Sequence, residues 1–375
     1  MYFCLISLVP IIFENQGNNQ MNNKIKIIFL GYDYLGGQFL QVLLNEYQGK
    51  IEVAAVSTNG AQPKDNFSKK YRQAKRLWKK NLFARELKNK IVLGKIINQK
   101  LLKNPPPSYN DITVMQLAEK HNIPAIDSQE ILSGDTKAVE AYNADFIVVA
   151  SFGKIPEAIY KNNPERVINF HPSYLPQLRG GSPLYSAIMR GMGQTGFSFH
   201  QLTQVFDAGP LRYQQIFAIE PSASCRQLEM AITIAGAHKL YDVLNGIANK
   251  TIGVIDISGR EITKCFRNYE ISTLLEPERF DTGHILRKIR ACSSWGLGAA
   301  YICKGFRHFY IAEAKPAQWD DSIANETIVY KEPEGLLIKT QDGAVLATQV
   351  YYKQKYYAGR ELAQFKRALF DVVKN

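Results

Sequence analysis

An amide and an imidazole stand two residues apart in the stretch Val167–Pro183, which reads VINFHPSYLPQLRGGSP. The stretch begins as an apolar strand, and side chains two apart on a strand point to the same side, so Asn169 and His171 should converge on one spot. A carboxylate, Asp207, follows on a turn after another predicted strand. An amide N–H can stabilise an oxyanion, and a carboxylate that raises the pKa of a neighbouring imidazole helps it to move a proton. These three side chains predict transfer of an acyl group without a covalent intermediate.

Other chemistries have less support in the residue types. His171 could instead be a buried histidine held between two turns by structural hydrogen bonds. No Ser or Cys of the stretch has a base partner for nucleophilic catalysis, and Ser173 suits a turn-forming hydroxyl. The five cysteines lack a C-x-x-C pair and the six histidines lack metal-ligand spacing. We therefore expect no metal site, no disulfide framework and a reducing compartment.

Alternating strand and helix patterns around this stretch predict an α/β fold with a doubly wound, Rossmann-like parallel sheet. Strands are expected at 25–31, 51–57, 123–126, 146–150 and 166–169, a β-arm at 196–202 and 211–219, and helices at 38–47, 113–121, 131–142, 183–192 and 224–247. The turn Gly31–Gly37 lacks G-x-G-x-x-G, so a nucleotide site is not supported. Ligands of such sheets bind at the carboxyl ends of the strands, which is where Asn169 and His171 lie.

Beyond residue 257 the pattern changes to short strands, expected at 262–266, 299–303, 306–311, 327–330, 335–339 and 344–350, with one helix at 280–290. Five or six short strands in about 100 residues predict a small C-terminal β-barrel of the OB type. The expected organisation is an N-terminal extension at 1–22, a catalytic domain at 23–250 and the barrel domain at 260–366. A chain ending near Asn249 should then keep the catalytic cavity.

A strongly basic segment interrupts the catalytic domain at 61–110. It holds fourteen Lys and Arg but only two acidic residues, a net charge of +12 that equals the net charge of the whole chain. Four aromatic residues are interleaved among the cations. A solvated basic insertion is the simpler interpretation, but the one-sided charge and the aromatic residues favour a polyanion-binding segment.

The central stretch resembles the tetrahydrofolate-dependent formyltransferases, whose pattern is Asn-x-His-Pro-Ser-x-Leu-Pro-x-x-Arg-Gly followed by Asp-x-Gly. The matching residues are Asn169, His171, Pro172, Ser173, Leu175, Pro176, Arg179, Gly180, Asp207 and Gly209. The resemblance implies 10-formyltetrahydrofolate as formyl donor and Asn169, His171 and Asp207 as catalytic residues. It also implies a cofactor-binding set made of Phe152, Gly153, Ser173, Leu175 and Pro176.

The basic segment and the C-terminal barrel resemble the methionyl-tRNA branch of that family, and Phe206–Leu211 is closer to its mitochondrial form. The resemblance implies initiator methionyl-tRNA as acceptor, bound by Lys69, Lys70, Arg72, Lys75, Arg76, Lys79, Lys80 and Arg179. For Arg179 a structural salt bridge is an equal alternative. A formyltransferase acting on an amino sugar nucleotide and a catalytically inactive RNA-binding homologue are the competing interpretations of the whole chain.

The first twenty residues have two interpretations. Residues 1–13 are apolar and carry no Lys or Arg, so they lack the basic start of a signal peptide. Either they are a degenerate targeting segment, or Met21 is the true start. We expect a monomer in the mitochondrial matrix, with a bacterial-type cytoplasm as the alternative. No apolar run reaches the length of about 18 residues needed to span a membrane, so no membrane partner is expected.

Overall fold

The computed structural model describes residues 24–58, 112–266, 273–295, 299–302, 308–322, 328–352 and 355–364. The N-terminal extension and the basic segment at 61–110 therefore lie outside the described residues, as do the seven lysines and arginines proposed within that segment. Within the described part no helix is long and apolar enough to cross a membrane.

The first sheet has six strands in the order β2-β1-β3-β4-β5-β6. Its strands are β1 (Ile25–Gly31), β2 (Ile51–Ser57), β3 (Phe146–Ala150), β4 (Val167–His171), β5 (Gln194–Gln201) and β6 (Leu211–Ala218). The first four in the order are parallel, and β5 and β6 are antiparallel to their neighbours. The sheet confirms the predicted Rossmann-like domain and its β-arm.

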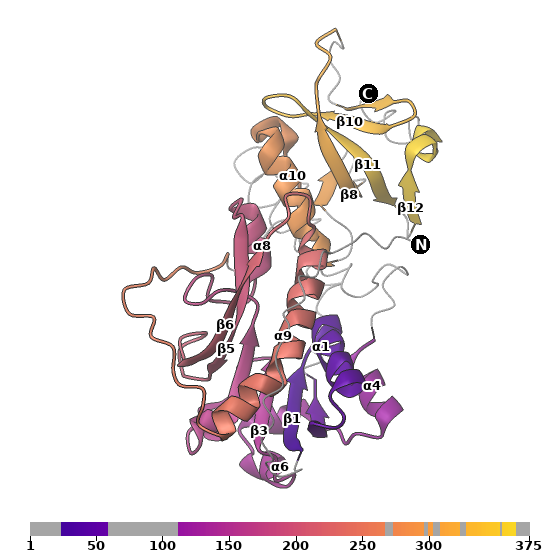
Figure 1. Cartoon of the computed structure of the whole chain (residues 1–375). Coiled ribbons are helices and arrows are strands. Elements are labelled where there is room, and N and C mark those ends of the chain that lie inside the picture. The colour runs from indigo at the N-terminus through magenta and orange to yellow at the C-terminus, as the bar shows by residue number, and fades with distance from the viewer. Residues whose placement is uncertain are drawn as a thin grey trace, which may run out of the picture.

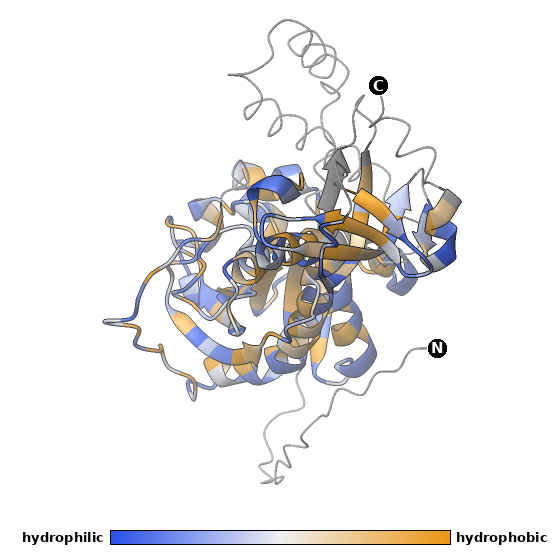
Figure 2. Cartoon of the chain, turned by 90° about the horizontal axis from the view of Figure 1, so that it is seen from above, coloured by the Kyte–Doolittle hydropathy of each residue, from blue (hydrophilic) through white to orange (hydrophobic). Residues whose placement is uncertain are grey.

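Apolar side chains of alternating strand positions build a core on each face of this sheet. Ile27 and Phe29 pack in one cluster with α1 (Asp33–Glu46), α4 (Val114–His121), α8 (Pro183–Met189) and α9 (Cys225–Ala248). Ile28 and Leu30 pack in another with α5 (Ser128–Ser133), α6 (Thr136–Glu140) and α7 (Glu157–Tyr160). Helices on both faces make the sheet doubly wound, as expected (Figure 1). Viewed from above, apolar residues concentrate in the strands of the interior (Figure 2).

Two helices differ from expectation. The helix expected at 131–142 is instead the pair α5 and α6, because Gly134 adopts φ +83° and Asp135 caps a new helix by accepting from the N–H of Lys137. Helix α1 begins five residues early and includes Gly37, where a Cβ atom would lie 1.9 Å from the Ile112 carbonyl oxygen. The glycine permits the close approach of this neighbouring segment.

The C-terminal region forms a separate antiparallel sheet, consistent with the predicted small β domain. Its strands are β7 (Ala299–Ile302), β8 (His308–Ala317), β9 (Ile328–Lys331), β10 (Gly335–Lys339), β11 (Ala344–Tyr352) and β12 (Lys355–Ala358), in the order β7-β8-β11-β10-β9 with β12 also on β11. Helix α10 (Thr282–Ala291) and the short helices η2 (Pro277–Arg279), η3 (Cys292–Trp295) and η4 (Gly359–Gln364) complete it; η1 (Pro164–Arg166) lies in the first domain. The strand expected at 262–266 is wrong, because only Lys264 pairs there, in one bridge to Arg179.

A long connection links the two regions. From the end of α9 it passes beside β6, where the N–H of Ile255 donates to the Leu211 carbonyl at 2.8 Å, and it returns to the loop after β4 (Figure 1). Ile285 and Ile289 of α10 are buried in the same cluster as Leu184 and Ile188 of α8. The two regions thus share one apolar core.

Candidate active site

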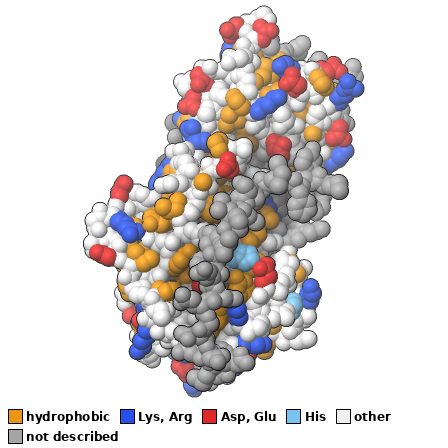
Figure 3. Space-filling model, viewed as in Figure 1, with side chains coloured by type: hydrophobic (Ala, Val, Ile, Leu, Met, Phe, Trp, Pro, Cys, Tyr) orange, Lys and Arg blue, Asp and Glu red, His pale blue; other side chains and the backbone are white. Residues whose placement is uncertain are grey.

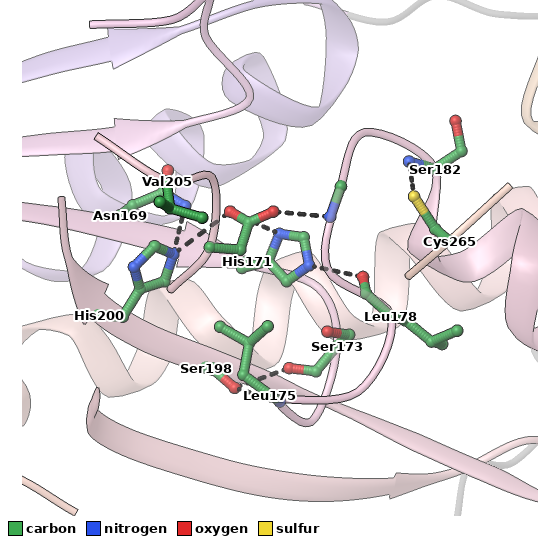
Figure 4. Close-up of polar contacts among 12 residues, drawn as sticks. Asn169, His171, Ser173, Leu175, Leu178, Ser182, Ser198, His200, Val205 and Cys265 are labelled. Atoms are coloured by element: carbon green, nitrogen blue, oxygen red, sulfur yellow. Dashed lines mark hydrogen bonds and ion pairs between the residues drawn. The ribbon is translucent and has the colours of Figure 1, made fainter. Parts of the chain in front are cut away.

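Asn169, His171 and Asp207 lie together, as their spacing predicts, but a fourth side chain lies among them. Asp207 Oδ1 is 3.6 Å from His171 Nδ1 and 3.5 Å from His200 Nε2, so the carboxylate stands between two imidazoles. Figure 4 shows the His171 and His200 rings on either side of this contact. The amide Nδ2 of Asn169 is 2.9 Å from the same Nε2 of His200. The candidate site is therefore a network of one carboxylate, one amide and two imidazoles.

Sheet register positions three of these four side chains. Asn169 pairs with His200 and His171 pairs with Ser198 across the antiparallel strands β4 and β5. His200 did not enter the sequence-based set of site residues. Its signal was available in the strand Gly196–Leu202, where Ser198 and His200 are polar residues two apart among apolar ones.

Backbone carbonyls decide which ring nitrogens carry hydrogen. His171 Nε2 lies 3.2 Å from the Leu178 carbonyl, and His200 Nδ1 lies 2.7 Å from the Gln201 carbonyl. A carbonyl only accepts, so both of these nitrogens must be protonated. Nδ1 of His171, which faces Asp207, is left as the nitrogen that can take up a further proton.

Burial sets the direction of the His171 pKa. The ring is only 5% exposed. Loss of solvation lowers the pKa of His171 below its usual value, and the opposing pull of the Asp207 carboxylate does not compensate. Asp207 does raise this pKa, as expected, but burial outweighs it and the net shift is downward. A neutral His171 near pH 7 is suited to accept a proton.

Asp207 has the opposite character. Burial alone would raise its pKa, but the hydrogen bond with His200, the nearby imidazoles and the N–H of Gly180, which donates to Oδ2 at 2.7 Å, bring the pKa to about 2. Asp207 is therefore a carboxylate at every pH at which the enzyme would be assayed, and a cation formed on His171 is stabilised by it.

The turn that carries Asp207 explains the Asp-x-Gly spacing. Asp207 has φ +52°, in the left-handed region that Asp tolerates better than most residues. Two residues later, a Cβ atom on Gly209 would lie 1.9 Å from the Gln201 carbonyl oxygen. The glycine lets the loop close against the end of β5 and hold the carboxylate at the imidazoles.

We predict that Gly209→Ala lowers the free energy of unfolding by about 1–3 kcal/mol, the usual cost of overpacking a tight site. Urea unfolding of the full chain measures this change. Gly193→Ala is the matched control, because a Cβ there meets nothing within 4 Å. Equal stabilities of the two variants would contradict the steric explanation.

A cavity of about 500 Å³ opens beside the network. Its wall includes Asn169, His171 and Asp207. It extends to Phe152 and Gly153 after β3 and to Val205 and Phe206 before Asp207. Other residues of the wall come from several elements and include Leu35, Gly180, Gly181, Ser182, Leu184, Tyr185, His200, Thr203, Glu229 and Thr233. The volume falls in the range of about 300–1,000 Å³ typical of small-molecule sites. Phe152 and Gly153 thus lie where a ligand could reach them.

Three residues assigned to cofactor binding lie instead beneath the cavity. Ser173 and Leu175 are 0% and 1% exposed, Pro176 is buried, and none of the three lines the cavity. Ser173 Oγ donates to the Gln177 carbonyl at 2.7 Å, so it shapes the loop as a turn hydroxyl does. The loop turns these side chains into the protein, so the structure adds no support for their assignment as ligand contacts, which stays a prediction.

Arg179 lies on the same loop but outside the cavity wall. Its Nε is buried without a hydrogen bond, and no ion pair to it is formed within the described part of the chain. The structural salt bridge considered for Arg179 is therefore not seen there, and its role in acceptor binding stays a prediction. No cluster of three or more His, Cys, Asp or Glu side chains among the described residues is arranged to hold a metal ion.

An ionised carboxylate beside a neutral imidazole and an amide donor, at the carboxyl ends of β3 and β4, suits transfer of a small acyl group. The chain belongs to the formyl transferase family, whose pattern it matches over residues 26–244.

Curated relatives agree with this family. The chain is similar to methionyl-tRNA formyltransferases of Borrelia turicatae (26% identical over 263 residues, 68% of this chain and 84% of the relative). It is likewise similar to those of Bacillus subtilis (28% over 259 residues, 67% and 78%) and a Sulfurihydrogenibium species (29% over 246 residues, 62% and 75%).

Solved structures share the fold at lower identity. The sugar 3N-formyl transferase WlaRD, solved with dTDP and 5-N-formyl-THF, matches with a TM-score of 0.54 at 17% identity, over 87% of this chain and 97% of that one. HypX from Aquifex aeolicus matches with a TM-score of 0.56 at 17% identity, over 92% of this chain and 48% of that one.

Proposed function

We propose that this protein transfers the formyl group of 10-formyltetrahydrofolate to the amino group of methionine on charged initiator tRNA. The observation that carries formyl transfer is the arrangement of Asn169, His171 and Asp207 on one cavity wall, with Asp207 ionised and His171 neutral. Folate bound against Phe152 and Gly153 would supply the formyl group to this wall.

Each of the three side chains has one task in the reaction. An amide nitrogen is a hydrogen-bond donor at any pH, so Asn169 can donate to the negative charge developing on the formyl oxygen. Nδ1 of His171 accepts the proton that the attacking amine loses and returns it to the departing nitrogen. Asp207 stabilises the imidazolium between these two transfers.

The finer choice of acceptor is supported by charge and by the relatives. The basic segment at 61–110 accounts for the whole net charge of +12. On the face drawn in Figure 3, the described Lys and Arg side chains are interspersed with Asp and Glu rather than gathered. A polyanionic acceptor explains such a segment, whereas an amino sugar nucleotide with two phosphates does not need it. The relatives named above are methionyl-tRNA formyltransferases.

An acceptor assay tests the proposal. The purified full chain is given 10-formyltetrahydrofolate with charged initiator methionyl-tRNA, or with a dTDP-amino sugar, and formylated product is quantified. We expect product from the tRNA alone. Product from the sugar alone would replace the proposed acceptor, and no product from either would leave the inactive RNA-binding homologue as the better interpretation.

The basic segment predicts a salt dependence. Replacing Lys69, Lys70 and Arg72 by Ala should flatten the slope of log affinity for tRNA against log salt by about 2 to 3 units, since each neutralised phosphate contributes about 0.7 to 0.9. KM for the tRNA should rise more than kcat falls, because binding rather than transition-state contact is lost. Filter binding between low and moderate salt measures the slope; a slope equal to that of the unmodified chain would show a merely solvated segment.

A further inference from the structure

The segment Thr263–Phe266, here called the strap, crosses the loop that follows β4. Its backbone joins that loop through three hydrogen bonds: Thr263 N–H to the Pro176 carbonyl at 3.4 Å, Arg179 N–H to the Thr263 carbonyl at 3.0 Å, and Cys265 N–H to the Arg179 carbonyl at 3.0 Å. The strap comes from the connection to the C-terminal domain, so it is distant in sequence from the catalytic motif that it contacts.

Thr263 holds the peptide groups on both sides of Leu178. Its Oγ1 accepts from the Leu178 N–H at 2.9 Å, and its carbonyl accepts from the N–H of Arg179, the next residue. Leu178 has φ +57°, a left-handed conformation that is unfavourable for leucine. The two hydrogen bonds that Thr263 accepts, one from the N–H of Leu178 and one from the N–H of Arg179, stabilise this conformation of Leu178.

The conformation of Leu178 determines where its carbonyl points. That carbonyl belongs to the same peptide group as the Arg179 N–H, and it lies 3.2 Å from His171 Nε2. Anchoring the N–H to Thr263 on one side therefore aims the oxygen at the imidazole on the other side. Thr263, Leu178 and His171 thus form a chain of contacts, whose last link, from Leu178 to His171, is drawn in Figure 4.

We propose that Thr263 is a positioning residue for His171: by accepting from the Leu178 N–H, its hydroxyl helps to hold Leu178 in the left-handed conformation that aims the Leu178 carbonyl at the ring, which keeps hydrogen on Nε2 and leaves Nδ1 as the nitrogen that exchanges a proton beside Asp207. The inference rests on the proposed role of His171 in formyl transfer, but its physical content, the protonation pattern of the ring, can be measured without any acceptor.

Several groups around His171 also act on its titration. Asp207 faces Nδ1, and His200 of β5 faces the same carboxylate. The thiol of Cys265 on the strap accepts from the Ser182 N–H at 3.3 Å and lies close to Gly180, whose N–H binds Asp207. Glu229 of α9 lines the same cavity. None of these groups is altered by a substitution confined to the Thr263 hydroxyl.

The decisive comparison is Thr263→Val against Thr263→Ser. Valine preserves the shape and removes the acceptor, whereas serine retains the hydroxyl. Thr251→Val is the matched control, since Thr251 lies on the same connection and its hydroxyl donates to the Gly246 carbonyl at 3.3 Å, outside the site. Histidine ¹⁵N NMR of the full chain, with His171 assigned by its absence in His171→Asn, reports the tautomer and titration of this ring.

In the unmodified chain and in Thr263→Ser, neutral His171 should carry its hydrogen on Nε2. In Thr263→Val the Nε2 signal should shift towards a mixture of tautomers. The midpoint of the titration should also fall, because the Leu178 carbonyl favours the charged ring. We expect kcat of Thr263→Val to drop about tenfold, part of the 10²–10⁴ that acid–base catalysis contributes, with little change in the KM for folate.

Three results would overturn the proposal: neutral His171 protonated on Nδ1 in the unmodified chain, a Thr263→Val spectrum identical to it, or a Thr263→Ser spectrum like that of valine. A loss of activity in Thr263→Val with an unchanged His171 spectrum would also overturn it, since the hydroxyl would then serve stability alone. If formyl transfer to methionyl-tRNA itself is not observed, the NMR comparison still decides the role of Thr263.

Discussion

Asp207→Asn should lower kcat for formyl transfer by about 100-fold or more, the scale of losing acid–base and electrostatic assistance. The amide has the shape of the carboxylate but no charge, so a cation formed on His171 Nδ1, 3.6 Å away, loses its counter-charge. Folate affinity should change little, because Phe152 and Gly153 line a different part of the cavity wall. Single-turnover kinetics with saturating donor measure the effect.

Asp242→Asn is the control for that substitution, since Asp242 is an exposed carboxylate of α9 whose partner is Lys239. Its kcat should equal that of the unmodified protein. Near-normal turnover in Asp207→Asn would remove the carboxylate from the mechanism and leave the His200–Asn169 pair as the functional part of the network.

The second large effect is the response to acid. His171 works as a base, and burial places its pKa below 6.5, so its neutral form should persist through neutral pH. Below that pKa, kcat should fall about tenfold per pH unit, or about 100-fold over two units, because only the neutral ring accepts a proton. Asp207, with a pKa of about 2, does not titrate in this range.

The acceptor amine also titrates, with a usual pKa of about 7.7–8.0, and so also shapes the plot of kcat against pH. His171→Asn distinguishes the two titrations, because it removes only the imidazole. The amine limb should remain in the variant and the His171 limb should disappear. A profile of unchanged shape in His171→Asn would show that another group is the base.

Stability should follow the same groups. Between the lowered pKa of His171 and about 6.5, the unfolded chain binds more protons than the folded one, so the free energy of unfolding falls as the pH falls through this window. The stabilisation from Asp207 is present above its unfolded pKa of 3.8 and is lost as the pH falls towards about 2.

Removing the C-terminal region would also remove the strap from the active-site loop. A chain ending near Asn249 was expected to keep the catalytic cavity, but it would lack Thr263 and Cys265 and would expose the face of α8 that packs on α10. Acceptor binding by the C-terminal domain is better tested by substitutions in the full chain.

The sequence by itself determined the local features of this protein. The alternation of side chains along a strand predicted that Asn169 and His171 lie on one side of β4. The apolar run Phe146–Ala150 predicted a buried central strand, which is β3. The net charge of the segment at 61–110 follows from counting its residues. Asp-x-Gly marked the turn of Asp207. These features depend on the order of neighbouring residues, so they can be read along the chain.

The tertiary structure alone decided how the imidazole of His171 is protonated. His200 comes 31 residues after Asn169, and Thr263 comes 85 residues after Leu178, and both reach the motif only when β5 and the strap pack against it. The direction of the His171 pKa depends on how much water folding removes from the ring relative to the attraction of one carboxylate. That balance is a property of the packed interior, and no spacing along the chain encodes it.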